Sequence, residues 1–135
     1  LATTPVWQFD FDARLSADQR RNTIFVAELE HDGHRVAQRV ATFVPNKHID
    51  YANPQLTATL HMLGDNRVAI TLAATSLARF VELSSVDADI VFSDNYCDVR
   101  AGQPVTVTCA LPDGWTLEQL RTSLRVQSLY DAFTA

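Results

Sequence analysis

Apolar and polar residues alternate at the start of this chain. Trp7, Phe9 and Phe11 fall on one face of an extended backbone, and the polar residues between them fall on the other. This period of two predicts a half-buried strand over residues 6–12. The next predicted elements are a short helical turn in residues 15–22 after Ser16, and a hairpin of two strands, 23–30 and 35–44, around the turn pair Asp32-Gly33.

Two prolines bracket the segment that follows the hairpin. Pro45 and Pro54 flank residues 46–53. Proline cannot donate a backbone hydrogen bond, so it continues neither a helix interior nor a central strand. We therefore expect a linker here and place a domain boundary near residues 45–53.

Beyond the linker, turn residues recur at intervals of roughly 8–14 residues, which is typical of short strands. Thr116 followed by Gln119 has the form of a capping box, which predicts one or two helical turns. Seven antiparallel strands with little helix predict an all-β fold, a β-sandwich of the immunoglobulin or fibronectin type III kind. The strands are expected at residues 55–62, 68–72, 77–83, 88–92, 95–99 and 105–111, with Leu124, Val126 and Leu129 on the last.

Composition narrows the range of partners. Apolar residues make up 47% of the chain, charged residues 20%, and the net charge is −5, as in ordinary globular domains. The basic residues are scattered and no apolar run reaches the roughly 18–20 residues that span a bilayer, so we expect neither a nucleic-acid nor a membrane partner. Cys97 and Cys109 match no metal-ligand spacing, which predicts two buried free thiols. We expect no cofactor; the sequence leaves the compartment open, and we favour a cytoplasmic location. Because the chain begins at Leu1 with neither Met nor a signal-peptide pattern, we expect a fragment of a longer protein.

No complete catalytic pattern is present. Glycoside hydrolysis uses two carboxyl groups about 5–10 Å apart, and two acidic pairs on predicted strand faces have a suitable spacing, but solvated strand faces carry many such pairs. The histidines lack a third metal ligand, and the serines lack the strand–turn–helix context of a nucleophile. We therefore expect no catalytic and no metal-binding residue among these candidates: Glu28, Glu30, Asp87, Asp89, His31, His34, His48, His61, Ser84, Ser85 and Ser93.

The most distinctive stretch runs from Phe92 to Gly102. Its acidic and amide side chains offer oxygen ligands of the kind that calcium takes. The same residue types bond nearby backbone groups at bends, and we favour this second interpretation, in which Tyr96 packs inward with its hydroxyl anchored on the backbone. The residues of this structural corner are Asp94, Asn95, Tyr96, Asp98 and Gly102.

Flat aromatic side chains raise the alternative of sugar stacking. The residues that offer it are Trp7, Tyr51, Trp115 and Tyr130. We favour packing in the core or between domains, because Trp7 lies on an apolar strand face and Trp115 lies where a loop must cover the end of the sandwich.

The corner resembles a known family. The stretch Phe92-Ser93-Asp94-Asn95-Tyr96-Cys97-Asp98-Val99-Arg100-Ala101-Gly102 is similar to a corner of the C-terminal immunoglobulin-like domain of glycoside hydrolase family 2 β-mannosidases, which typically reads FSDNYFDLLPGE. The chain departs from this pattern at Cys97, which stands for an aromatic residue, and at residues 100–103, which lack the proline. Residues 25–29, 43–47, 77–81 and 124–131 fit the same family.

The resemblance implies a large enzyme that removes terminal, non-reducing β-D-mannosyl residues by a retaining mechanism, with two catalytic glutamates in an upstream TIM barrel. Those glutamates have no counterpart in this chain, so we expect a non-catalytic accessory domain. The resemblance also implies that residues 1–45 are the final strands of an incomplete preceding sandwich domain. Residues 46–135 are then the C-terminal immunoglobulin-like domain.

The predicted strands of the first third cannot close a sandwich alone, so they leave an apolar face and an unpaired edge. We expect residues 1–44 to dock on other domains of the parent enzyme, on the C-terminal domain of this chain, or on a second copy of it. Two other functions stay open, a carbohydrate-binding module that uses exposed aromatic residues and a cell-surface adhesion sandwich.

Overall fold

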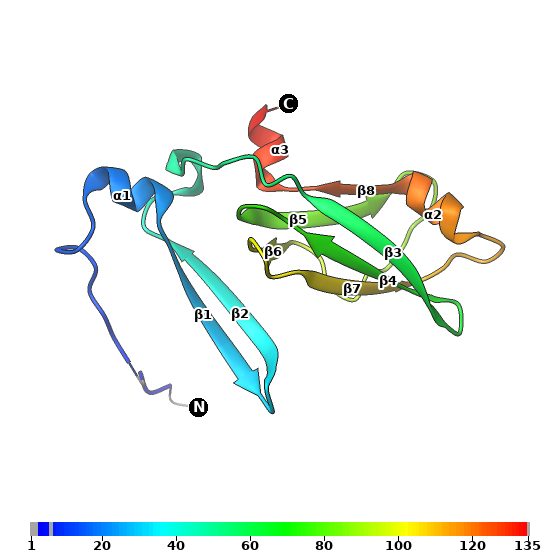
Figure 1. Cartoon of the computed structure of the whole chain (residues 1–135), viewed down its shortest axis with the longest axis horizontal. Helices are drawn as coiled ribbons and strands as arrows, with labels where there is room; N and C mark the ends of the chain where they lie inside the picture. Colours follow the sequence, from blue (N-terminus) through cyan, green and yellow to red (C-terminus); the bar gives the residue numbers. More distant parts are fainter. Residues whose placement is uncertain (1–2, 6, 135) are drawn as a thin grey trace. The chain divides into compact units, whose positions relative to one another are not determined.

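The computed structural model describes residues 3–5 and 7–134 and divides the chain into two compact units, Leu1–Asp50 and Tyr51–Ala135. We call them unit 1 and unit 2 and describe each by itself (Figure 1). The predicted division into domains of residues 1–45 and 46–135 stays a prediction. The two units are compact, but compactness does not show that each unit folds independently.

Unit 1 consists of a short helix and a long hairpin. Helix α1 (Ala17–Asn22) begins at Ser16, whose Oγ accepts a hydrogen bond from Gln19 N at 3.3 Å, while Gln19 Oε1 accepts one from Ser16 N at 2.9 Å. This capping box satisfies amide groups that the first helical turn leaves free. Strands β1 (Ile24–His31) and β2 (His34–Thr42) pair antiparallel, and a 3-10 helix, η1 (Asn46–His48), follows. The predicted helical turn and hairpin are confirmed.

The predicted strand over residues 6–12 is wrong where the structure describes it. Residues 7–11 have no regular secondary structure, and Val6 lies outside the described residues. The backbone turns back at Phe11, whose carbonyl oxygen accepts hydrogen bonds from Arg14 N and Leu15 N. Alternation reports which side chains share a face, but a strand also needs a partner backbone, which alternation does not report.

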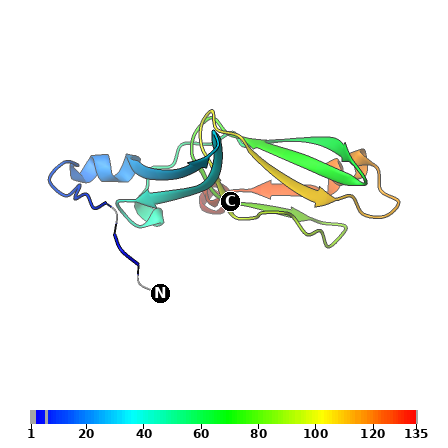
Figure 2. The ribbon, with the colours of Figure 1, turned by 90° about the horizontal axis from the view of Figure 1, so that it is seen from below.

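Unit 2 is a β-sandwich, with two three-stranded antiparallel sheets in its described residues. One sheet has the strand order β3-β4-β7 and the other β6-β5-β8, and Figure 2 shows them as separate layers. The predicted all-β, immunoglobulin-like sandwich is confirmed. The strands are β3 (Thr57–Gly64), β4 (Arg67–Ala73), β5 (Ala78–Ser85), β6 (Cys97–Val99), β7 (Val105–Ala110) and β8 (Leu124–Gln127).

The core of unit 2 lies between these sheets. Val68, Ile70 and Leu72 of β4 are fully buried, and Val81 and Leu83 of β5 contribute to the same cluster. Alternate residues of each strand face the opposite sheet, as the period of two predicts. The outward residues of β5 are therefore left to form the surface that carries the candidate site.

Two helices flank the last strand. Helix α2 (Leu117–Ser123) begins at Thr116, whose N donates to Gln119 Oε1 at 2.7 Å, so the predicted capping box is confirmed. Helix α3 (Leu129–Thr134) follows β8, and Ser128 N donates to the Asp131 carboxylate at 2.7 Å. The prediction that Leu129 lies on the last strand is wrong, because Ser128 and Asp131 have the spacing that begins a helix.

Residues 88–92 do not form the predicted fourth strand of unit 2. Phe92 makes an isolated bridge to Cys109. Upstream, Val86 N donates to Ser123 O and Asp87 N donates to Ser123 Oγ. Because these amide groups bond to the last residue of α2, the chain leaves the sheet after β5. The described residues of unit 2 therefore form six strands instead of the predicted seven.

Candidate functional site

The candidate site is built around an interruption in β5. The register shifts between Ala78 and Val81, and Phe80 has a φ of 50°, a left-handed value that is uncommon for a bulky residue. Arg79 is 7% exposed, whereas Phe80 is 40% exposed. The bulge therefore buries a guanidinium group and turns the next side chain, an aromatic ring, toward solvent.

Asp98 of β6 holds this bulge. Its Oδ1 accepts hydrogen bonds from Arg79 Nε at 3.3 Å and from Phe80 N at 3.1 Å, and its Oδ2 accepts one from Arg79 Nη2 at 3.4 Å. The side chains of Arg79 and Asp98 are 8% and 15% exposed, so solvent screens this ion pair only weakly. The carboxylate of Asp98 is thus engaged in holding two consecutive residues of β5.

Asn95 continues the hydrogen-bond ladder of β5 with its side chain. Leu83 N donates to Asn95 Oδ1 at 2.8 Å, and Asn95 Nδ2 donates to Leu83 O at 2.9 Å. The carboxamide replaces a peptide group of a neighbouring strand, so both backbone groups of Leu83 are satisfied. The prediction that Asn95 bonds nearby backbone at the bend is confirmed, since Tyr96 N donates to Asn95 Oδ1 at 3.0 Å, and the same side chain also bonds Leu83, 12 residues away.

The remaining corner residues differ in outcome. Asp94 Oδ1 accepts a hydrogen bond from Asn95 N at 2.8 Å, as predicted for a bend, and Gly102 has a φ of 67°, which glycine adopts without strain. The prediction for Tyr96 is wrong, because its side chain does not pack inward: Tyr96 is 60% exposed. Its φ of 58° takes the backbone out of the extended conformation just before β6, and the ring is directed to solvent.

The oxygen atoms of the corner serve protein donors. Both carboxylate oxygens of Asp98, Oδ1 of Asn95 and Oδ1 of Asp94 accept the hydrogen bonds given above. Calcium takes six to eight oxygen ligands. Within residues 3–5 and 7–134, no group of three or more His, Cys, Asp and Glu side chains is placed to hold a metal ion. The geometry of the corner is that of a structural joint.

Both cysteines are free thiols, as predicted. Burial raises the pKa of Cys97 to about 11, with a smaller contribution from the negative charge of Asp94, and burial also raises the pKa of Cys109. A raised pKa keeps the thiol protonated at neutral pH, and the thiol is a much weaker nucleophile than the thiolate. Neither cysteine has the environment of a covalent catalyst.

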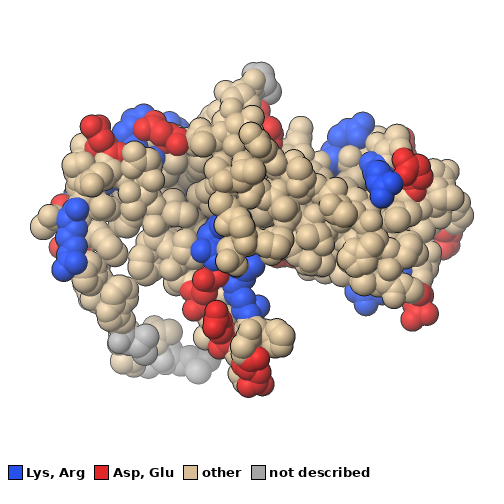
Figure 3. All heavy atoms as spheres, viewed as in Figure 1, with Lys and Arg blue, Asp and Glu red and all other residues tan. Residues whose placement is uncertain are grey.

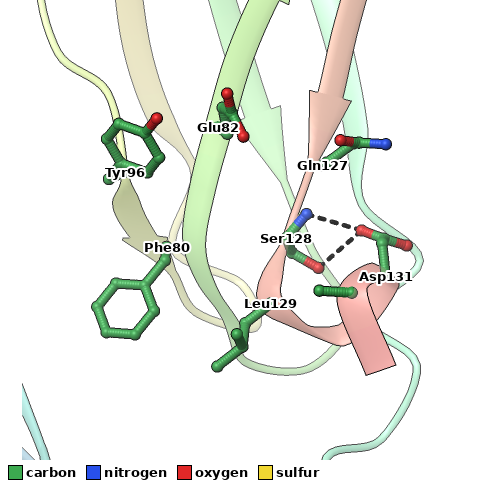
Figure 4. A pocket seen from close by; sticks show the side chains of 8 residues that line it. Phe80, Glu82, Tyr96, Gln127, Ser128, Leu129 and Asp131 are labelled. Atoms are coloured by element: carbon green, nitrogen blue, oxygen red, sulfur yellow. Dashed lines mark hydrogen bonds between the residues drawn. The ribbon is translucent and has the colours of Figure 1, made fainter. Parts of the chain in front are cut away.

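A groove of about 400 Å³ opens beside the corner (Figure 4). In this view Phe80 and Tyr96 lie on one side of β5, and Gln127 and Asp131 lie on the other, on β8 and α3. Glu82 of β5 projects between them, and it is the cross-strand partner of Gln127. The groove thus combines exposed aromatic rings with hydrogen-bonding side chains.

The sequence reasoning missed this groove, although part of its signal was present. Phe80 and Glu82 alternate with the core residues Val81 and Leu83, which assigns them to the outer face of the sheet. The outward direction of Tyr96 depends on its left-handed backbone, which no residue preference predicts.

The candidate carboxylate pairs do not form catalytic pairs. Glu28 accepts from Arg35 Nη1 at 3.1 Å, and a bulge between Leu29 and Glu30 interrupts the face that Glu28 and Glu30 were predicted to share. Asp87 and Asp89 lie in the loop after β5, so the strand face predicted for them is wrong.

The candidate histidines and serines are also dispersed. His31, His34, His48 and His61 are exposed. Ser85 Oγ lies 2.6 Å from Ser123 Oγ, Ser93 Oγ accepts a hydrogen bond from Thr108 N at 2.9 Å, and Ser84 is exposed. In this arrangement the two bonded serines stabilise the loops between strands.

Aromatic rings gather in unit 1. The centroid of Phe11 lies 4.7 Å from that of Phe9, 5.8 Å from Phe25 and 5.2 Å from Phe43. Trp7 stacks on Phe9 and Phe25 at centroid distances of 5.5 and 6.1 Å. We call these five residues the aromatic cluster. Trp7 is 62% exposed and does not lie on a strand, so it is not part of a core within this chain, and the predicted packing between domains stays a prediction.

The other three aromatic residues considered for sugar stacking are partly buried. Trp115 packs against the core of unit 2, as predicted. Tyr51 lies beside Arg79, and burial raises the pKa of its hydroxyl although the positive charge of Arg79 opposes the shift. Tyr130 is partly buried in α3. Their ring faces are therefore less accessible than that of Trp7.

The charged side chains are mixed on the surface. Figure 3 shows small groups of basic side chains next to acidic ones on the face that it draws. Arg21 Nη2 lies 2.6 Å from Asp50 Oδ1, and this hydrogen bond lowers the pKa of Asp50. None of the helices in the described part of the chain has the length and apolar character to cross a membrane.

Each unit matches a family model. A family model described as an Ig-fold domain of mannosidases matches residues 51–132, and a model described as a mannosidase Ig/CBM-like domain matches residues 1–48. A search of curated proteins finds no match.

The chain is also similar to a solved structure, the crystal structure of β-D-mannosidase from Dictyoglomus thermophilum, with a TM-score of 0.70 and 17% sequence identity. The match covers 78% of this chain and 13% of that one, so the chain spans a small part of that protein's length. At this identity the similarity shows the fold. The resemblance to the C-terminal immunoglobulin-like region of family 2 β-mannosidases is confirmed, and the chain belongs to the family of mannosidase Ig-fold domains.

Proposed function

We propose that this chain is a non-catalytic accessory domain of a β-mannosidase whose parent enzyme hydrolyses terminal, non-reducing β-D-mannose residues by a retaining mechanism. The family matches and the fold similarity to a β-D-mannosidase support the assignment to such an enzyme. The observation that supports the non-catalytic role is that the polar side chains of the corner are hydrogen-bonded within the fold. Asp98 is bonded to Arg79 and Phe80, and Asn95 to Leu83, so the polar groups of the most distinctive stretch serve the fold.

The proposed role is mechanical. A general acid and a nucleophile need two carboxyl groups that face the substrate at a fixed separation. Unit 2 instead provides a packed core and a rigid joint between β5 and β6. A body of this kind is suited to support the domains that carry the two catalytic glutamates of the parent enzyme.

An assay of the purified chain on an aryl β-mannoside tests this proposal. We expect phenol release at the rate of the buffer blank, with a complete family 2 β-mannosidase as the positive control. Turnover that copurifies with the chain and scales with its concentration contradicts the proposal. The variant Glu82→Gln is the internal control. Glu82 is a carboxylate of the groove that makes no hydrogen bond or ion pair with the described residues, so among the groove residues it is the best candidate for a catalytic acid.

We also propose that the aromatic cluster of unit 1 packs on other domains of the parent enzyme, and that residues 1–44 support self-association of the isolated chain. Trp7 and Phe9 are 62% and 38% exposed. Burial of such rings is favourable by about 25 cal/mol per Å² of apolar surface. The accessible face of the cluster is therefore suited to a partner surface.

Light scattering over a range of concentrations tests the self-association. We expect dimers that dissociate when Trp7 and Phe9 are both replaced by Ala. The variant Phe133→Ala removes an exposed ring of unit 2 and is expected to associate like the wild type. A wild-type monomer at every concentration, with residues 1–44 rapidly cut by protease, is the contrary result.

A further inference from the structure

Two aromatic rings are held at the surface of unit 2 by strained backbone. Phe80 and Tyr96 have φ values of 50° and 58° and are 40% and 60% exposed. A left-handed conformation costs a bulky residue about 1–2 kcal/mol, and glycine avoids this cost. A corner that only had to turn is better served by glycine. The strain keeps both rings at the mouth of one groove.

The corner fixes the direction of these rings. Phe80 N donates to Asp98 Oδ1 at 3.1 Å, and Tyr96 N donates to Asn95 Oδ1 at 3.0 Å. Asp98 and Asn95 are themselves held by β5, through Arg79 and Leu83. The backbone positions of both rings are thus set before any ligand arrives, which lowers the entropic cost of binding.

The opposite side of the groove offers free hydrogen-bonding groups. Glu82 and Gln127 face each other across β5 and β8, and in the described part of the chain neither side chain makes a hydrogen bond or an ion pair. A carboxylate accepts hydrogen bonds, whereas a carboxamide both donates and accepts them. Asp131 is already engaged with Ser128, and Leu129 adds an apolar lining at the end of the groove.

The charges of the groove select the class of ligand. The carboxylates of Glu82 and Asp131 repel an anion. The Arg79 guanidinium lies 4.6 Å from the centroid of the Phe80 ring, so this ring already makes a cation–π contact within the chain. A neutral ligand that has hydroxyl groups around its edge and C–H groups on its faces matches both the rings and the free polar groups. Pyranose sugars have this character.

We propose that this groove binds a neutral pyranose, as a single unit or as part of a short oligosaccharide. Phe80 and Tyr96 provide the stacking surface, and Glu82 and Gln127 bind hydroxyl groups. The volume of about 400 Å³ lies within the range of small-molecule sites, roughly 300–1,000 Å³. The inference goes beyond the accessory role and rests on the proposed function only for the choice of a mannoside as the probe.

A titration of the 135-residue chain with β-1,4-mannobiose, followed by two-dimensional NMR of the backbone amides, tests the site. We expect saturable shifts at Phe80, Glu82, Tyr96 and Gln127, with a dissociation constant on the order of 1 mM. Sorbitol, which has hydroxyl groups but no ring face, is expected to cause no saturable shift. Shifts that do not saturate, or equal shifts with sorbitol, overturn the proposal.

Two variants locate the binding. Tyr96→Gly removes one ring while its backbone conformation becomes less strained, so the fold is kept, and we expect binding to weaken about tenfold. Phe133→Ala removes an exposed ring that does not line the groove and is expected to bind like the wild type. Unchanged affinity of Tyr96→Gly overturns the proposal.

A cationic probe and the activity assay separate the remaining outcomes. If lysine amide binds the groove more tightly than mannobiose, the groove is a docking surface for a basic protein segment, and this result contradicts the proposal that it binds a sugar. The hydrolysis assay of the isolated chain is independent of this titration. Binding can therefore fail while the accessory role stands, and turnover can contradict the accessory role whatever the titration gives.

Discussion

The two units enclose their apolar side chains to different degrees. In unit 2, Val68, Ile70 and Leu72 are fully buried between two sheets. In the described part of unit 1, Val40 is the one hydrophobic residue that is buried, at 5% exposed. Trp7 remains 62% exposed although it stacks on other rings. One unit has a closed core, and the other has a cluster with an open side.

The difference follows from the number of layers. A single hairpin has two faces and no second sheet to cover either of them, so its apolar residues can pack only on each other and on the segment before it. Two sheets enclose a core between them. The comparison indicates that unit 2 closes its core with its own contacts, whereas the aromatic cluster of unit 1 keeps an accessible side.

The largest expected effect is the loss of a core side chain of unit 2. Leu72→Ala removes a fully buried residue, and we expect the free energy of unfolding of unit 2 to fall by about 2–5 kcal/mol, since a cavity remains. Urea unfolding followed by Trp115 fluorescence in a Trp7→Phe background reports unit 2 alone. The control Leu29→Ala, at a residue of unit 1 that is 62% exposed, is expected to leave this transition unchanged. Equal effects of both variants contradict a closed core.

The next largest effect is expected at the buried ion pair. Asp98→Ala leaves the Arg79 guanidinium and Phe80 N without their shared acceptor, and we expect a loss of about 3 kcal/mol in the same unfolding measurement. Glu28→Ala removes the partner of Arg35 in the more exposed pair of unit 1 and is expected to cost less than about 1 kcal/mol in the unfolding of that unit, followed by Trp7 fluorescence. If Asp98→Ala changes the free energy of unfolding only slightly, the bulge does not depend on the Asp98 carboxylate.

A smaller effect is expected at the carboxamide that extends β5. Asn95→Ala leaves Leu83 N and Leu83 O without their side-chain partner, and we expect a cost of about 1–3 kcal/mol. Asp94→Ala removes a single bond to an exposed neighbouring amide, and we expect a loss below about 1 kcal/mol. The reverse order of the two effects is inconsistent with the ladder geometry.

The smallest expected effect is the pH dependence of stability that arises from Cys97. Unfolding returns the pKa of Cys97 from about 11 to the ordinary value of 9.0, so this thiol leaves stability unchanged below pH 9.0 and reduces it as the pH rises from 9.0 to about 11. At pH 8 we expect iodoacetamide to alkylate the folded chain much more slowly than the urea-unfolded chain. Asp94→Asn removes the smaller cause of the raised pKa and is expected to lower the pH at which alkylation accelerates. Rapid alkylation of folded Cys97 at pH 8 contradicts the burial of this thiol.

The local signals in the sequence predicted much of the fold. Ser16 with Gln19 and Thr116 with Gln119 began helices where expected, because a capping box is complete within four residues. The alternation of Val68, Ile70 and Leu72 placed the core strand for the same reason.

The long-range contacts were not predictable in this way. Asn95 bonds Leu83 across 12 residues, and Phe80 turns outward at a bulge that Asp98 supports from another strand. The groove depends on both contacts and on the left-handed backbone of Tyr96, which residue preferences disfavour. The corner motif indicated that the stretch was unusual, but its outward-facing rings required the tertiary structure.

Native-state hydrogen exchange of the whole chain tests the central contrast most directly. We predict that the amides of β4 and β5 exchange only by global opening of unit 2. The amides of β1 and β2 are expected to open at a free energy lower by at least about 2 kcal/mol, since their sheet lacks a covering layer. Equal protection of the hairpin and of the core strands, in a chain that is monomeric, contradicts the account of a closed unit and an open one.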